Sequence, residues 1–120
     1  MKVNLKNGIL MEINFSRTKL QKVFNSEAEL KKAYGEQARI IMRRMVMLRA
    51  ASNLSDVSHL PPVRRHELTG ELQNHFAIDL KQPFRLLFKP NHDPVPKKKD
   101  GGIDLENVTA ITITEIKDYH

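Results

Sequence analysis

Short stretches in which apolar and polar residues alternate predict β-strands at both ends of the chain. Met11–Phe15 alternates near the start, and Thr109–Ile116 alternates near the end, with Ile111 and Ile113 on one side. A period of two is typical of a strand that buries one face. Three more strands are predicted in the middle of the chain, near Arg64–Leu68, His75–Leu80 and Phe84–Lys89.

The last two of these middle strands have one apolar side and one polar side. The apolar side is expected to be buried, and it holds Phe76, Ile78, Leu80, Phe84, Leu86 and Phe88. The alternate positions hold His75, Asp79 and Arg85. We therefore expect any chemistry to lie on the polar side of the sheet.

The segment between the first strand and the middle strands predicts helices. Thr18–Phe24 fits one or two helical turns, and Ser26 followed by Glu29 has capping-box spacing, so a helix should begin near residue 26. Gly35 predicts a break between two helices. From Glu36 to Ala51 the apolar residues recur at helical spacing, and three basic residues lie off that stripe: Arg39, Arg43 and Arg44.

This order of elements predicts a single α+β domain over residues 1–120. An N-terminal strand and two helices precede a four-stranded antiparallel sheet that packs on the helices. Residues 90–102 contain three prolines, three consecutive lysines and Gly101-Gly102, and we expect them to form a mobile loop. The chain has no cysteine, which excludes disulfides and thiolate metal sites, and we expect neither a metal nor a cofactor.

The charge of the chain favours a polyanionic partner. The sequence has 20 Lys and Arg against 14 Asp and Glu, a net charge of +6. Residues 1–50 alone carry 11 basic and 4 acidic side chains, so the helical half is the most basic part. Such a surface neutralises phosphates and releases their counterions. No stretch approaches the roughly 18 apolar residues of a membrane helix, and we expect a cytoplasmic protein without a membrane partner.

Metal-free RNA cleavage needs an acid, a base and cations, and the chain contains candidates for each. Histidine suits both proton-transfer roles because its pKa of about 6.5 leaves both forms available near neutrality. His66 follows Arg64-Arg65, and the chain closes with Asp118-Tyr119-His120. If the last strand lies beside the middle ones, His66, Arg85 and the tail converge. The alternative is a structural role, in which Arg85 only pairs with Asp79 or Glu115 on the sheet surface.

A set of ordered motifs resembles the HigB-like plasmid-maintenance killer toxins of the RelE superfamily. The helical half contributes Tyr34-Gly35, Ala38, Arg44, Leu48 and Ala51. The sheet half contributes His66-Glu67-Leu68, Gly70, Phe76-Ala77-Ile78, Pro83-Phe84-Arg85-Leu86, Phe88 and Ile116-Lys117-Asp118-Tyr119-His120. The similarity covers about residues 11–120.

The resemblance implies a RelE-like fold and a ribosome-dependent mRNA endonuclease that a helix-turn-helix antitoxin neutralises. It implies that His66 is the mid-chain catalytic histidine, that Asp118, Tyr119 and His120 form the catalytic tail, and that Arg85 binds the scissile phosphate. Contacts with mRNA or ribosomal RNA are expected from further residues: Arg39, Arg43, Arg64, Arg65, His75, Lys97, Lys98 and Lys99.

Two departures from the family pattern leave other functions open. Thr69 stands where some relatives carry a lysine, so Arg64, Arg65 or a loop lysine must supply that cation. His75-Phe76 stands where relatives often have two aromatic residues. The alternatives are a non-catalytic toxin similar to the gyrase inhibitors, a degenerate member that binds only its antitoxin as a corepressor, and a generic RNA-binding module. The low aromatic content of 6% disfavours the last.

Overall fold

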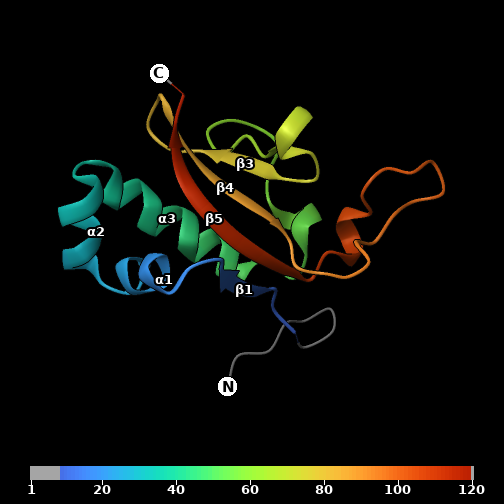
Figure 1. Cartoon of the computed structure of the whole chain (residues 1–120), viewed down its shortest axis with the longest axis horizontal. Coiled ribbons are helices and arrows are strands. Elements are labelled where there is room, and N and C mark those ends of the chain that lie inside the picture. The colour runs from blue at the N-terminus through green and yellow to red at the C-terminus, as the bar shows by residue number, and fades with distance from the viewer. Residues whose placement is uncertain (1–8, 120) are drawn as a thin grey trace.

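The computed structural model describes residues 9–119, and it has an α+β fold in which helices cover one face of a twisted sheet (Figure 1). The helices are α1 (Thr18–Phe24), α2 (Glu27–Tyr34) and α3 (Gln37–Ala50). The strands are β1 (Glu12–Phe15), β2 (His66–Glu67), β3 (Phe76–Asp79), β4 (Phe84–Pro90) and β5 (Ala110–Asp118). Single 3₁₀ turns occur at Leu54–Asp56, Gly70–Leu72 and Leu105–Asn107.

The five strands form one mixed sheet in the order β1-β5-β4-β3-β2. The strands β2, β3, β4 and β5 pair with one another in the antiparallel direction, as the sequence predicts. The prediction of a purely antiparallel sheet is wrong, because β1 pairs with the edge of β5 in the parallel direction. Glu12 lies opposite Ala110, and Phe15 lies opposite Ile113. A parallel pair needs a long crossover connection, and everything from α1 to β4 supplies it.

The prediction of two helices is also corrected, because α1 is a separate third helix. Leu20 and Phe24 lie four residues apart on α1, and both are buried, so the short segment is held by packing. The predicted cap of α2 is present, since the backbone N–H of Glu29 donates to Ser26 Oγ at 3.2 Å. Gly35 has a φ of 55° and joins α2 to α3, as the sequence indicates.

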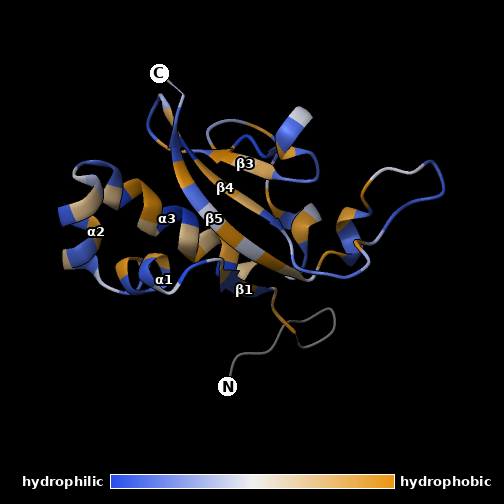
Figure 2. Ribbon diagram, in the orientation of Figure 1, coloured by the Kyte–Doolittle hydropathy of each residue, from blue (hydrophilic) through white to orange (hydrophobic). Residues whose placement is uncertain are grey.

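The core lies between the helices and one face of the sheet. Figure 2 shows apolar residues concentrated along the strands, whereas the long segment between β4 and β5 is largely hydrophilic. Fully buried core residues come from both layers, including Ile41, Leu48, Ile78, Leu86, Phe88, Ile111 and Ile113. Ala77 and Leu87 are also fully buried but lie outside this core cluster, because they face the other side of the sheet. No helix among residues 9–119 is long and apolar enough to span a membrane.

Two predicted segments differ in detail from the structure. The strand expected at Arg64–Leu68 contains only His66–Glu67, because Arg64 has a left-handed backbone (φ 50°) that no strand residue adopts. The segment expected to be a loop after β4 contains an isolated β-bridge between Lys97 and Ile103. Ile103 is buried, so this segment is anchored on the core at its far end.

Candidate functional site

The sheet face opposite the helices carries most of the candidate residues, and we call it the polar face. Strand register places Asp79 of β3 opposite Arg85 of β4, and Arg85 opposite Lys117 of β5. Directly opposed residues on neighbouring strands point to the same side. Tyr119 lies two residues beyond Lys117, so it belongs to the same side. His66 belongs there too, because it lies opposite Ala77, which is two residues from Asp79 on β3.

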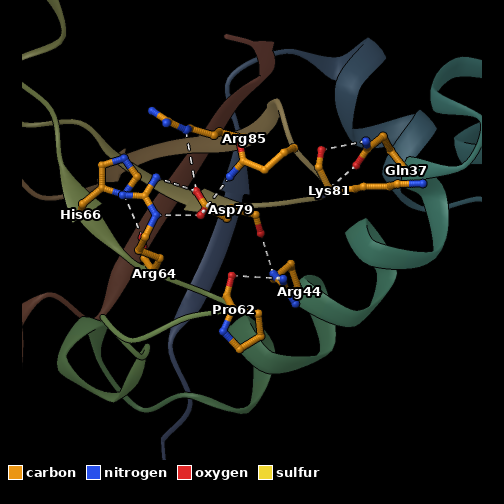
Figure 3. Close-up of polar contacts among 9 residues, drawn as sticks. Gln37, Arg44, Pro62, Arg64, His66, Asp79, Lys81 and Arg85 are labelled. Atoms are coloured by element: carbon orange, nitrogen blue, oxygen red, sulfur yellow. Dashed lines mark hydrogen bonds and ion pairs between the residues drawn. The ribbon is translucent and has the colours of Figure 1, made fainter. Parts of the chain in front are cut away.

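Asp79 is the centre of the polar face and is only 7% exposed. Its carboxylate accepts two hydrogen bonds from the Arg64 guanidinium, at 2.7 Å from Nε and 3.0 Å from Nη2 (Figure 3). This hydrogen bonding raises the pKa of Arg64. Arg64 has a left-handed backbone conformation, and this conformation costs on the order of 1–2 kcal/mol for a residue other than glycine. The bidentate pair with Asp79 helps to offset that cost.

Arg85 lies beside the same carboxylate but is bound less completely. Its Nε is 3.7 Å from Asp79 Oδ1, which is an ion pair too long to be a hydrogen bond. The Nε atom is buried and has no hydrogen-bond partner in the structure. Its guanidinium carbon lies 4.2 Å from the centre of the Tyr119 ring, within the range of a cation–π contact. Arg85 is therefore positioned by an acid and a ring while its hydrogen-bonding capacity is only partly used.

His66 presents one nitrogen that makes no hydrogen bond. Nδ1 lies 2.7 Å from the backbone carbonyl oxygen of Arg64. A carbonyl only accepts, so Nδ1 carries the proton and Nε2 of the neutral ring keeps its lone pair. Nε2 is buried and has no hydrogen-bond partner in the structure. An imidazole fixed in this tautomer is suited to accept a proton at Nε2 from a group that comes close to it.

The chain end lies beside β4, but its three candidate residues do not share one position. The Tyr119 backbone N–H donates to the Pro83 carbonyl at 3.1 Å, and its ring covers Arg85. Asp118 lies opposite Phe84 in the β4–β5 register, so it belongs to the other side of the sheet from Arg85. His120 lies outside the described residues. The structure thus brings His66, Arg85 and Tyr119 to one face and puts Asp118 on the other.

Comparisons with known proteins identify no relative of this chain: no family model, no curated protein and no solved structure matches it. The likeness to the HigB-like toxins therefore depends on the sequence motifs alone.

The four arginines expected to contact RNA fall into three groups. Arg39 and Arg43 are exposed on α3, which packs against the opposite side of the sheet. Arg65 is turned into the fold, where its Nη1 donates to the carbonyls of Leu54 at 2.9 Å and Val57 at 2.6 Å, and burial lowers its pKa. Arg64 is the third case, because it lies on the polar face itself.

Two hollows receive the remaining candidates. One, of about 260 Å³, is lined by His66 and by Lys98, which belongs to the segment between β4 and β5. A loop lysine therefore lies near the candidate catalytic histidine. The other, of about 450 Å³, is lined by His75 and Lys89. Lys97 and Lys99 are exposed on either side of Lys98.

Sequence reasoning missed two residues that hold this part of the sheet: Asp79 on the polar face and Arg44 on α3. Asp79 was noted only as a possible partner of Arg85, although an acidic residue in the middle of a wholly buried strand must be paired. Arg44 was placed off the apolar stripe of its helix and given no role. Its Nε donates to the Asp79 carbonyl at 2.7 Å, and burial lowers its pKa while Asp79 raises it. Among residues 9–119 no group of three or more His, Asp or Glu side chains is arranged to hold a metal.

Proposed function

We propose that this chain is an endoribonuclease toxin of the HigB-like type with a RelE-like fold, and that it cuts mRNA on the ribosome until a helix-turn-helix antitoxin neutralises it. The observation that carries the proposal is the unpartnered Nε2 of His66 on the same face as Arg85 and Tyr119. Two arginines, Arg64 and Arg85, face one carboxylate there, so the face keeps an excess of positive charge. Such a site attracts a phosphodiester.

The proposed reaction uses His66 as the base. Its Nε2 takes the proton of a 2′-hydroxyl, the 2′-oxygen attacks the neighbouring phosphorus, and the bond from phosphorus to the 5′-oxygen breaks. The products are a 2′,3′-cyclic phosphate and a 5′-hydroxyl. Asp118 is the less suitable base because its register puts it on the other side of the sheet. His120 is proposed to protonate the leaving oxygen, and this role comes from the resemblance alone.

The cations have separate tasks in this proposal. Arg85 stabilises the charge that grows on the phosphorane, because its Nε lacks a hydrogen bond in the free protein. Arg64 and Lys98 are the two candidates for the cation that Thr69 cannot supply. Lys98 lines the same hollow as His66, and its ion pair with Asp100 is long, at 3.9 Å, and exposed.

The proposal is tested by mapping the ends of mRNA in a translating extract. His66→Ala should lower the cleavage rate by about 10²–10⁴-fold, the usual contribution of one acid or base. His59→Ala is the matched control, since His59 is an exposed histidine outside the polar face. Fragments with 3′-hydroxyl ends, or a loss below about tenfold for His66→Ala, would contradict the proposed mechanism.

One observation favours a second candidate, a non-catalytic toxin or corepressor that only binds its partner. Asp79 engages both Arg64 and Arg85, and His66 Nε2 is buried, so a substrate must displace neighbouring atoms to reach it. Under this alternative, expression of the chain is harmless or inhibits DNA supercoiling, and mRNA stays intact. Parallel assays of supercoiling and of mRNA integrity separate the two candidates.

A further inference from the structure

We infer that the second hollow on the polar face binds a nucleobase of the RNA strand and sets the sequence preference of cleavage. This inference rests on the proposed function. The hollow has a volume of about 450 Å³, within the range of sites for small molecules. Its lining includes Gln73, Asn74, His75, Lys89, Asn91 and Asp93.

The hollow continues the side of the sheet on which the phosphate would bind. Arg85 and Lys89 are four residues apart on β4, so both point to the polar face at a separation of about 13 Å along the strand. His75 immediately precedes Phe76, the residue opposite Phe88 in the β3–β4 register, and it lines the hollow together with Lys89. An RNA strand held at Arg85 and running along β4 therefore brings a neighbouring nucleotide to the hollow.

The lining of the hollow suits a base better than a phosphate. The side-chain amides of Gln73, Asn74 and Asn91 each offer both donors and an acceptor. Lys89 and Asp93 contribute opposite charges, so the hollow has no net attraction for an anion. The arginine cluster around Asp79 differs in this respect, because its cations outnumber its carboxylate. The arginine cluster at one end of the face therefore suits a phosphate. The hollow at the other end suits a neutral base, which it would recognise by hydrogen bonds.

The wall of the hollow is held in place by the backbone around it. His92 Nε2 accepts hydrogen bonds from the backbone N–H groups of Thr109 at 3.0 Å and Ala110 at 3.2 Å, which fixes the segment after β4 against β5. The Asn91 N–H donates to the Ala110 carbonyl at 2.8 Å. Asn74 has a φ of 71°, which forms the opposite turn. A preformed wall of this kind lowers the cost of ordering on binding.

The experiment uses uncleavable 2′-O-methyl RNA trinucleotides and follows the backbone and side-chain amide signals of the full-length protein by NMR. We expect shifts at the hollow that depend on the identity of one base. Asn91→Ala should weaken the preferred trinucleotide by about 5–100-fold, the range for one lost base contact, and abolish the preference. Asn25→Ala, an exposed asparagine at the end of α1, should change neither.

Shifts confined to the arginine cluster, a hollow that responds equally to all bases, or no shift at all would overturn the base site. The cleavage assay in translating extract is judged separately. If mRNA is cut but Asn91→Ala keeps the wild-type cleavage pattern, the base site fails and the proposed nuclease stands. If base-dependent shifts occur but no mRNA is cut, the nuclease fails and the base site stands.

Discussion

At the scale of single residues, the polar face depends on one buried carboxylate. Asp79 is taken out of water in a strand whose residues are all buried, and such a charge is stable only if it is paired. Two hydrogen bonds to this acid offset the backbone strain of Arg64. Arg85 forms an ion pair with the same carboxylate. The carboxylate therefore positions both arginines that are candidates to bind phosphate.

Replacing Asp79 with asparagine tests this role. Asp79→Asn keeps the shape but leaves Arg64 and Arg85 without a counterion, and we expect the free energy of unfolding to fall by about 1–3 kcal/mol, since Arg64 is partly exposed and water compensates it. Urea denaturation measures the change. Asp100→Asn is the control, because Asp100 is 72% exposed in a weak ion pair and should change stability by less than about 0.5 kcal/mol. Equal effects of the two substitutions would disprove a central role for Asp79.

The contact between Arg85 and Tyr119 gives a second prediction at this scale. A cation over an aromatic ring is worth about 0.5–1 kcal/mol when it is partly exposed. A double-mutant cycle with Arg85→Gln and Tyr119→Leu should show a coupling energy of that size. Tyr119→Phe keeps the ring and should leave stability unchanged within error. If Tyr119→Phe and Tyr119→Leu are equally destabilising, the hydroxyl and not the ring face is the important group.

At the scale of elements, periodicity predicted most of what the structure contains. The alternation in Phe84–Lys89 and the stripe of Glu36–Ala51 depend only on which side of each element is buried, so they were read correctly. The pairing of β1 with β5 could not be predicted from the sequence. Alternation shows which face of a strand is buried, but it does not show which strand lies beside it or in which direction the two pair. The shortening of β2 was hidden too, since nothing in the letters Arg64-Arg65 shows that the first of them adopts a left-handed backbone.

The joint between β4 and β5 supplies a prediction for an element. His92 accepts two backbone N–H groups at the start of β5, and His92→Ala leaves both donors without this acceptor. We expect faster hydrogen exchange at Thr109 and Ala110 and a loss of about 1–3 kcal/mol of stability. His59→Ala should leave exchange at these two amides as it is in the wild type. Unchanged exchange in His92→Ala would show that the rest of β5 holds this joint.

At the scale of the whole molecule, the basic residues belong to two separate surfaces. The count of charged residues in the sequence predicts a basic surface, but it does not show which side of the sheet each basic side chain occupies. Arg39 and Arg43 are exposed on the helical side, whereas Arg64, Arg85 and Lys98 border the candidate site. The helix α3, which carries Arg39 and Arg43, lies behind the sheet from the polar face (Figure 1), so we expect a short RNA segment to contact only one of the two groups.

This separation predicts different salt dependences for two sets of variants. With a short single-stranded RNA, Lys98→Ala should reduce the slope of log affinity against log salt concentration by about 0.7, because one phosphate contact is lost. The double variant Arg39→Ala/Arg43→Ala should leave this slope unchanged, since those arginines lie on the far side. With whole ribosomes the double variant should instead bind more weakly, if ribosomal RNA reaches the helical surface. Fluorescence anisotropy with the short RNA and co-sedimentation with ribosomes give both readings. If the double variant lowers the slope for the short RNA, substrate RNA also contacts the helices. The polar face would then be only part of the RNA-binding site.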